Sequence, residues 1–439
     1  MATSESTGFV VSPRRTMGAP SLGVMNFLNE VAAQYPSAIS FAPGRPIESL
    51  FRVADALAHI ERYAEHQAEA LGIPAGEALD RLGQYGRTNG IIHALVAQHL
   101  AVDEGIEVDP EAIVMTSGAQ EAMTILLLGL FEPGHDVLLV SDPSYIGITG
   151  MADILGIDVE PVPTGPSGLE PSMLASAIAR VRASGKNPKA IYDIPDFNNP
   201  MGTRLPLAAR RELLAVAEAE RVLVIEDNPY GMFAYDTARA PTLKSLDARG
   251  QVVYLGTFSK TLFPGLRLGY MVADTLCGGA GGAPLSHELS KVKSLTTVNT
   301  SGLLQAAAGG ILMASGGSLV AASADKIAFC RANRDALLSG LARTFGVDPL
   351  LSGRVRWNRP AGGFFLTLEL PFECAEAQVR TCARDYGVIC CPMSFFSRLP
   401  GRERHVRLAF SYVETSLIEE GVQRLWRFVH ETAPELEGG

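Results

Sequence analysis

The chain has 439 residues, of which 47% are hydrophobic and 19% are charged, and its formal net charge is −10. This composition is typical of a globular protein, and the length is sufficient for one large domain and a smaller one. The acidic balance and the lack of a long basic run argue against nucleic acid as the main partner. No apolar stretch is long and unbroken enough to predict a membrane span.

The cysteines indicate a reducing compartment. None of them forms a CxxC pair, and the adjacent Cys390 and Cys391 suit neither a zinc ribbon nor a disulfide framework. The first twenty residues also lack the continuous apolar core of a signal peptide. We therefore expect free thiols, no metal site and a cytoplasmic protein.

In chain order, residues 1–20 are expected to form a mobile leader, and apolar residues at helical spacing follow at 24–31. Residues 50–100 are mostly helical in pattern, interrupted by the loop "QYGRTNG". From residue 111, short apolar runs alternate with helical stretches; the runs are "AIVMT", "DVLLV", "KAIYDIP", "VLVIED", "VVYLGTFSK" and "LGYMVA". This alternation predicts an α/β fold with a mainly parallel central sheet and helices on both faces.

The pattern changes after a glycine-rich stretch at 276–284, which we expect to be a flexible loop. A long helical region at 318–346 is followed by strand, strand, helix, strand and helix. This order predicts a smaller α+β domain. We divide the chain into a leader (1–20), an N-terminal segment that joins the small domain (21–75), a large domain (76–317) and the small C-terminal domain (318–439).

Unusual residues follow the predicted strands, where open α/β sheets bind ligands. "SGAQ" opens a helix after one strand with small residues, which suits an anion. Other strands end in "DPSY", "NNPMG", "EDNPY" and "TFSK", the last of which contains Lys260. Each feature alone has a structural explanation, such as a cap, a turn, a packing tyrosine or a solvated lysine.

Taken together, the strand ends offer an anion cup, an aromatic face, an amide, a carboxylate, a phenol, a lysine and an arginine. This set matches one ligand, a flat phosphorylated pyridine aldehyde, which is pyridoxal 5′-phosphate. A lysine amine can form a Schiff base with that aldehyde. The sequence therefore predicts this cofactor, with Lys260 as its covalent anchor.

The motifs "FAPGRP", "QYGRTNG", "TSGAQEAM", "DPSY", "FNNPMG", "EDNPY", "TFSKTLFPGLRLGY", "RPAGGFF" and "VRLAF" occur in this order between about residues 39 and 429. In them the chain resembles the fold-type I pyridoxal-phosphate aminotransferases of class I/II, nearest the branch of the 2-aminoadipate and kynurenine aminotransferases. The resemblance implies that Lys260 carries the cofactor and shuttles the substrate proton, with nearby cations keeping it partly neutral. Asp227 would pair with the ring nitrogen, and Tyr145 would stack on the ring. The remaining implied cofactor contacts are Tyr230 and Asn199 to the ring oxygen, and Ala119, Gln120, Thr257, Ser259 and Arg267 to the phosphate.

The resemblance also implies a homodimer, in which Tyr85 reaches the phosphate of the neighbouring subunit. Arg407 would bind the α-carboxylate of an amino acid or 2-oxo acid, and Gly44, Arg45 and Asn199 would lie beside the substrate. Relatives often have Ser or Thr where Ala119 stands, so we expect slightly weaker cofactor retention. Arg45 would contact a polar or acidic side chain, with a structural ion pair as the equal alternative.

For the substrate, the stretches "MNFLNEVAAQYPSAISFAPGRPIE" and "ARDYGVICCPMSFF" resemble the aminotransferases that make 3,5-dihydroxyphenylglycine and related arylglycines for peptide antibiotics. Phe41, Phe395 and Phe396 are possible apolar walls, although core packing is the better interpretation of at least two. The scaffold also carries eliminases, decarboxylases and cyclising enzymes that act on S-adenosylmethionine, which all retain the lysine and the aspartate. These reactions remain the alternative to transamination. Transcription factors with this fold add an N-terminal DNA-binding domain, for which the leader is too short.

Overall fold

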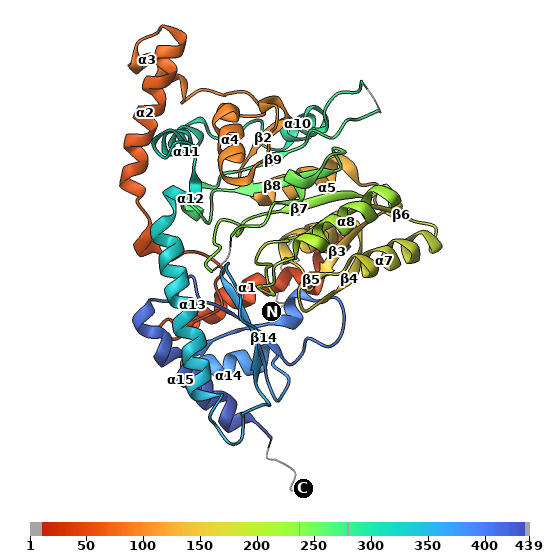
Figure 1. The fold of residues 1–439 in the computed structure, drawn as a ribbon, viewed down its shortest axis with the longest axis vertical. Coiled ribbons are helices and arrows are strands. Elements are labelled where there is room, and N and C mark those ends of the chain that lie inside the picture. The colour runs from red at the N-terminus through yellow and green to blue at the C-terminus, as the bar shows by residue number, and fades with distance from the viewer. Residues whose placement is uncertain (1–10, 237, 279–280, 435–439) are drawn as a thin grey trace, which may run out of the picture.

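The computed structural model describes residues 11–236, 238–278 and 281–434 (Figure 1). Its largest element is an eight-stranded sheet with the order β2-β9-β8-β7-β6-β3-β4-β5. Neighbours from β8 through β4 run parallel, whereas β9 is antiparallel to both β2 and β8. The strands span β2 Ile113–Thr116, β3 Asp136–Asp142, β4 Asp158–Gly165, β5 Gly168–Leu169, β6 Asn187–Asp193, β7 Leu223–Asp227, β8 Val252–Thr257 and β9 Gly269–Val272.

Helices cover both faces of this sheet, as predicted. Alternate residues of β3 show why, because Leu139 belongs to an apolar cluster with α7 and α8, whereas Leu138 and Val140 belong to the main core on the other face. The α-helices of this part are α2 Val53–Leu71, α3 Ala75–Arg81, α4 His93–His99, α5 Ala119–Leu130, α6 Ile146–Leu155, α7 Pro171–Ala183, α8 Leu207–Glu220, α9 Leu243–Leu246, α10 Leu285–Thr296 and α11 Gly302–Ala314.

Strand β4 is absent from the sequence prediction. It contains Pro161 and Pro163, which break the apolar pattern of a buried strand. Beyond β4 the sheet continues only with the two-residue β5, so β4 is close to an edge strand, where proline is tolerated.

The smaller domain contains the four-stranded sheet β10-β11-β14-β13 and lies below the large sheet in Figure 1. The two-stranded pair β1-β12 joins it, with Ile39 opposite Val388. The elements are α1 Val24–Gln34, β1 Ile39–Ser40, α12 Leu319–Ala322, α13 Ala324–Thr344, β10 Arg356–Trp357, β11 Phe365–Glu369, α14 Glu376–Tyr386, β12 Val388–Ile389, β13 Cys391–Pro392, β14 His405–Ala409 and α15 Thr415–Thr432.

The N-terminal segment divides between the two domains. Strand β1 pairs with β12 of the small domain, whereas α2 packs along α11 of the large domain. We therefore propose that the small-domain part of this segment ends before α2, near residue 52, rather than at residue 75. Residues 1–10 of the leader predicted over 1–20 lie outside the described residues, as do positions 279–280 of the glycine-rich loop.

The structure bears on the cysteines, on membrane-spanning helices and on clusters of metal-binding side chains. All six cysteines are unpaired. Within the described ranges, no helix is long and apolar enough to cross a membrane, and no His, Cys, Asp and Glu side chains gather as a metal site.

Candidate active site

The carboxyl ends of the central strands meet the small domain at a cavity of about 460 Å³. Parallel register brings these ends together, since Asp193 of β6 lies opposite Glu226 of β7, and Asp227 lies opposite Leu255 of β8. All of the predicted site residues except Tyr85 line this cavity, namely Gly44, Arg45, Ala119, Gln120, Tyr145, Asn199, Asp227, Tyr230, Thr257, Ser259, Lys260, Arg267 and Arg407.

The anion cup lies at the N-terminus of α5. Gly118 precedes the helix with φ 82°, and no side chain caps the first backbone N–H groups. A Cβ atom at position 118 would lie 2.8 Å from Nη2 of Arg267, so glycine is needed for the close approach of the guanidinium. Arg267 makes two long hydrogen bonds, of 3.5 Å each, to the carbonyl oxygens of Pro264 and Ser117, and it has no carboxylate partner among the described residues. Free N–H groups and an unpaired cation suit a phosphate.

Asp227 ends β7 at the base of the cavity. Its Oδ2 accepts a hydrogen bond of 2.6 Å from the Tyr192 hydroxyl, whereas Oδ1 is buried and has no partner within the described part of the chain. Burial raises the pKa of Asp227 to about 7, although the Tyr192 hydrogen bond and the charge of Lys260 act in the opposite direction. The carboxylate is thus available to one further donor.

Lys260 follows β8, and its Nζ donates a hydrogen bond of 3.0 Å to the Gly44 carbonyl oxygen. Its pKa is lowered to about 8, primarily by burial and then by the charges of Arg407, Arg267 and Arg45, while Asp227 raises it. The sequence prediction credited the cations alone, but desolvation is the larger cause. A lysine with this pKa is substantially neutral near pH 8, which suits both nucleophile and base.

Polar side chains that line the cavity with Lys260 form three separate sets of hydrogen bonds. Asn199 donates to the hydroxyl oxygen of Tyr230 over 3.4 Å, and Tyr145 lies 3.5 Å from Oε1 of Gln120. Gln120 also donates to the Gly147 carbonyl oxygen over 2.8 Å. Thr257 and Ser259 are linked by a hydrogen bond from the Ser259 backbone N–H to Oγ1 of Thr257, at 3.1 Å.

Arg407 enters the cavity from β14 of the small domain. Its Nη1 donates to Oδ1 of Asn199 at 2.7 Å and its Nη2 to the Ala42 carbonyl oxygen at 2.5 Å, while Nε is buried without a partner. The guanidinium lies over the rings of Phe365 and Phe396, at 4.5 and 4.8 Å from their centroids. A buried cation without a carboxylate partner favours an anionic ligand.

Gly44 and Arg45 occupy the mouth of the cavity. A Cβ atom at position 44 would lie 2.6 Å from the ring of Phe365, so this position requires glycine. Arg45 stacks on the Tyr412 ring at 4.5 Å, donates to its hydroxyl oxygen at 2.9 Å and lies 3.6 Å from Glu48. The structure therefore shows the internal contacts that the sequence left as an alternative for Arg45.

The three phenylalanines differ in their positions. Phe41 is fully buried in the core, and Phe395 packs edge-on against Phe27 with ring centroids 5.8 Å apart. Only Phe396 lines the cavity. This agrees with core packing for at least two of the three.

Several cavity residues were missed from the sequence. Leu28 and Ala32 come from α1, Met123 from α5, and Tyr412 from the turn after β14. Tyr192, which lies outside the cavity lining, was also missed, although a phenol in the buried strand segment "AIYD" is a usable signal. Their roles depend on contacts between distant segments, which local patterns do not encode.

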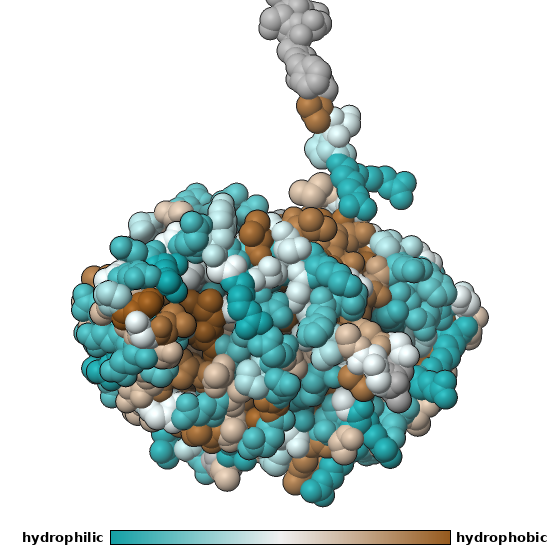
Figure 2. Space-filling model, turned by 90° about the horizontal axis from the view of Figure 1, so that it is seen from above, coloured by the Kyte–Doolittle hydropathy of each residue, from teal (hydrophilic) through white to brown (hydrophobic). Residues whose placement is uncertain are grey.

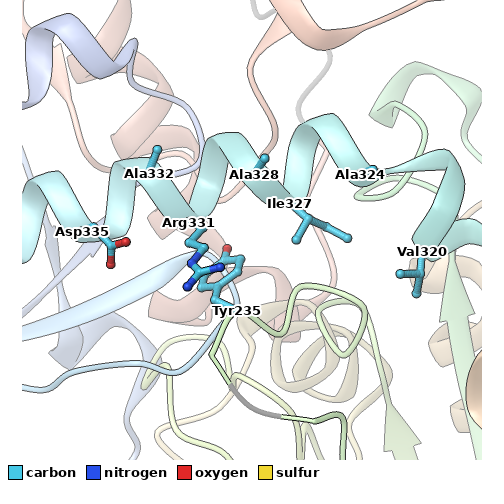
Figure 3. Close-up of a pocket in the computed structure, with 8 residues that line it drawn as sticks. All are labelled: Tyr235, Val320, Ala324, Ile327, Ala328, Arg331, Ala332 and Asp335. Carbon is cyan, nitrogen blue, oxygen red and sulfur yellow. The ribbon is translucent and has the colours of Figure 1, made fainter.

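A second hollow, of about 530 Å³, runs along α13 (Figure 3). Its wall is formed by Ala324, Ala328, Ala332 and other side chains of α12 and α13, with Tyr235 opposite. Its cation, Arg331, is already paired with Asp236 at 3.2 Å. It lacks the convergent polar groups of the cavity at Lys260, which remains the candidate active site.

The residues at Lys260 fit pyridoxal phosphate on structural grounds. An anion cup with an unpaired arginine, a buried carboxylate oxygen without a donor and a lysine with lowered pKa correspond to the phosphate, the ring nitrogen and the aldehyde. The cup contains no hydroxyl at Ala119, as noted from the sequence.

Comparisons with known proteins agree with this fit. The family model "Aminotransferase class I and II" matches residues 64–425. The (S)-3,5-dihydroxyphenylglycine transaminase of Amycolatopsis orientalis is 43% identical over 406 residues, covering 92% of this chain and 91% of the relative. The 2-aminoadipate transaminase of Thermus thermophilus is 30% identical over 399 residues, covering 90% of each. The kynurenine aminotransferase of Pyrococcus horikoshii, solved with PMP, superposes with a TM-score of 0.82 at 26% identity and covers 97% of this chain and 98% of that one. The chain belongs to the class I and II aminotransferases, with the fold of the fold-type I enzymes, and it is an aminotransferase that uses pyridoxal phosphate.

Proposed function

We propose that this protein moves an amino group between an arylglycine or related aromatic amino acid and a 2-oxo acid. The observation that carries the proposal is the convergence of Lys260, Asp227, Arg267 and Arg407 on one cavity with a largely apolar outer wall. The 43% identity to a dihydroxyphenylglycine transaminase supports the choice of an arylglycine.

Lys260 is assigned two tasks, covalent attachment of the cofactor and transfer of the substrate Cα proton. The bound cofactor supplies an electron-withdrawing ring that stabilises negative charge at Cα. The pKa of about 8 leaves the free lysine able to accept that proton. Asp227 is assigned to the ring nitrogen, because, among residues 11–236, 238–278 and 281–434, its Oδ1 is the only carboxylate oxygen that is buried without a hydrogen-bond donor.

The other cofactor contacts are assigned from the positions of the residues in the cavity wall. The backbone N–H groups of Ala119 and Gln120, the hydroxyls of Thr257 and Ser259 and the guanidinium of Arg267 are assigned to the phosphate. Tyr145 is assigned to ring stacking, and Asn199 and Tyr230 to the ring oxygen.

Arg407 is assigned to the substrate α-carboxylate. The planar guanidinium can bind a carboxylate with two hydrogen bonds, and its unpartnered Nε atom is one available donor. Asn199 holds the opposite side of the guanidinium at 2.7 Å, which fixes its orientation.

The outer wall favours a neutral aromatic side chain over an acidic one. Apolar atoms come from Leu28, Ala32, Met123, Ile146 and Phe396. Arg45 is the cation nearest the mouth, and it is already engaged by Tyr412 and Glu48. An acidic side chain would have to compete for Arg45, whereas an aryl group fills the apolar wall without displacing a contact.

We propose a homodimer in which Tyr85 completes the partner's site. Tyr85 does not line the cavity of its own chain and is 78% exposed, and Leu295 of α10 is 90% exposed. Figure 2, which views the molecule from the end that carries α3 and α10, shows apolar side chains on an otherwise hydrophilic surface. Exposed apolar side chains of this kind support burial against a second copy. The unpaired cysteines support a reducing, cytoplasmic location.

An amino-donor screen tests the function. Purified holoenzyme is mixed separately with arylglycines, aromatic amino acids, 2-aminoadipate, glutamate and S-adenosylmethionine, and cofactor absorbance and products are followed. We expect the aminated cofactor and an aryl 2-oxo acid with arylglycines. Preference for 2-aminoadipate would contradict the substrate assignment, and ring closure or elimination without a 2-oxo acid would contradict transamination.

A further inference from the structure

A buried tyrosine lies directly behind the carboxylate assigned to the cofactor ring. Tyr192 is the penultimate residue of β6 and is fully buried. In the sheet it lies opposite Ile225 of β7, two residues before Asp227. Its hydroxyl oxygen lies 2.6 Å from Oδ2 of Asp227. Asp227 lines the cavity whereas Tyr192 does not, so Tyr192 contacts this carboxylate from outside the cavity lining.

The direction of this hydrogen bond is determined by chemistry. An ionised carboxylate only accepts hydrogen bonds, so the hydroxyl of Tyr192 is the donor. Burial and the neighbouring charge of Asp227 raise the pKa of Tyr192 far above its usual range, so the hydroxyl keeps its proton at any physiological pH. Tyr192 is therefore a permanent donor to Oδ2.

This donor leaves the two oxygens of Asp227 in unequal environments. Oδ2 is occupied, while Oδ1 is buried and lacks a partner. A short hydrogen bond to one oxygen restricts rotation of the carboxylate and keeps the other oxygen available to the cavity. The hydrogen bond also favours the ionised form of Asp227 against the effect of burial.

We propose that Tyr192 is a positioning residue, which restrains the carboxylate of Asp227 through Oδ2 and directs its free oxygen Oδ1 to the ring nitrogen of the cofactor. The inference rests on the proposed role of Asp227 and adds a residue beyond it. Tyr192 touches neither the substrate nor the cofactor, and it acts only through the carboxylate.

The test compares two ligands that differ at the ring nitrogen. Pyridoxine 5′-phosphate has no aldehyde and binds without covalent attachment, and its 1-deaza analogue replaces the ring nitrogen with a C–H group. Affinities of the apo-protein for both are measured by calorimetry in the wild type, Tyr192→Phe and Tyr254→Phe. Tyr254 is the matched control, because it is also fully buried, lies on β8 at the opposite side of β7 from Tyr192 and contacts Asn228 rather than Asp227.

We expect the wild type to bind the pyridine compound more tightly than the deaza analogue. Tyr192→Phe should weaken binding of the pyridine compound by about tenfold to a hundredfold, the range for loss of a hydrogen bond to a charged group. Binding of the deaza analogue should change by less than about twofold, and Tyr254→Phe should leave the preference intact. Equal weakening of both ligands by Tyr192→Phe, or no weakening of either, would overturn the inference. A wild type that binds both ligands equally would instead refute the role of Asp227.

A measurement on the wild type covers the case in which Tyr192→Phe does not fold. A buried hydroxyl proton in a 2.6 Å hydrogen bond to a carboxylate is expected as a slowly exchanging low-field proton resonance. Its position should move when pyridoxine 5′-phosphate binds and stay unchanged with the deaza analogue. Absence of the resonance, or an equal response to both ligands, would contradict a link from Tyr192 through Asp227 to the ring nitrogen.

Discussion

The Nη1 atom of Arg407 donates a hydrogen bond to Oδ1 of Asn199 across 2.7 Å, and this contact joins β14 of the small domain to the loop after β6 in the large domain. Asn199 in turn donates to Tyr230 over 3.4 Å. The residue assigned to the substrate carboxylate is therefore linked through Asn199 to the residue assigned to the cofactor ring. Since Arg407 itself is assigned to the substrate, a change at Arg407 should weaken substrate binding more than cofactor binding.

Arg407→Lys is expected to raise KM for the amino acid by about tenfold to a hundredfold, because lysine cannot provide the planar pair of donors. The spectrum of the bound cofactor should remain that of the wild type. Steady-state kinetics with a fixed 2-oxo acid measure the change, and Arg404→Lys is the control, since Arg404 is exposed and its Nε bonds the Leu370 carbonyl oxygen. An unchanged KM would remove Arg407 from the substrate site.

Lys260→Ala is expected to abolish both turnover and the visible absorbance of the covalently bound cofactor, because Lys260 is the only lysine among the described residues that line the cavity. Absorbance spectra and an assay of the 2-oxo acid product measure the two losses. Lys291→Ala, which changes an exposed lysine of α10, should have neither effect. Intact turnover in Lys260→Ala would refute the assignment of the site.

Asp227→Asn is expected to stabilise the apo-protein at alkaline pH. In the fold the pKa of Asp227 is raised from 3.8 to about 7, so between these values the folded state holds a proton that the unfolded chain has lost. The associated stability is complete below pH 4 and is lost as the pH rises through about 7, amounting to at most about 4 kcal/mol. Asparagine does not titrate, so it makes no pH-dependent contribution to the free energy of unfolding.

Urea unfolding of the apo-protein, at a fixed protein concentration and at pH 5 and pH 8, measures this pH dependence of stability. The free energy of unfolding of Asp227→Asn, relative to wild type, should be larger at pH 8 than at pH 5. The same variant should bind pyridoxine 5′-phosphate more weakly than the wild type. A difference that does not vary with pH would show that Asp227 is ionised in the folded apo-protein across the whole range.

Ala119→Ser is expected to slow release of the cofactor by about threefold to tenfold, because the hydroxyl adds one hydrogen bond to the phosphate at the N-terminus of α5. The rate is measured by dilution of holoenzyme into a trap for free cofactor. Ala122→Ser, one turn further along the helix and fully buried, tests whether any added hydroxyl has this effect. A faster release in Ala119→Ser would mean that the cup has no room for the side chain.

A hybrid experiment examines Tyr85. Tyr85→Ala and Lys260→Ala should each be nearly inactive, but a mixed dimer would contain one site with both residues intact. When equal amounts of the two variants exchange subunits at random, half of the dimers are mixed and each mixed dimer has one intact site of two. The mixture should therefore have about a quarter of the wild-type activity. Mixtures that remain inactive after verified subunit exchange would contradict a contribution of Tyr85 to the partner's site.

Parts of the fold could be predicted because their patterns are local. The strands that end at Asp227 and Thr257 begin with short apolar runs, LVI and VVYL, as expected for strands buried on both faces. Strand β4 escaped prediction because Pro161 and Pro163 interrupt such a pattern. The packing of α2 on α11 could not be predicted either. The apolar pattern of an amphipathic helix shows which face is buried, but it does not show which element packs against that face.

The sequence by itself determined the chemistry of the site. Parallel strands have their carboxyl ends at one edge of the sheet, so the strand order implied by the sequence groups residues such as Asp227 and Lys260. Tertiary structure alone decided which oxygen of Asp227 is free, how burial sets the pKa of Lys260, and that Tyr412 and Glu48 already hold Arg45. Those properties depend on distances and desolvation among residues far apart in the chain, which no local spacing specifies.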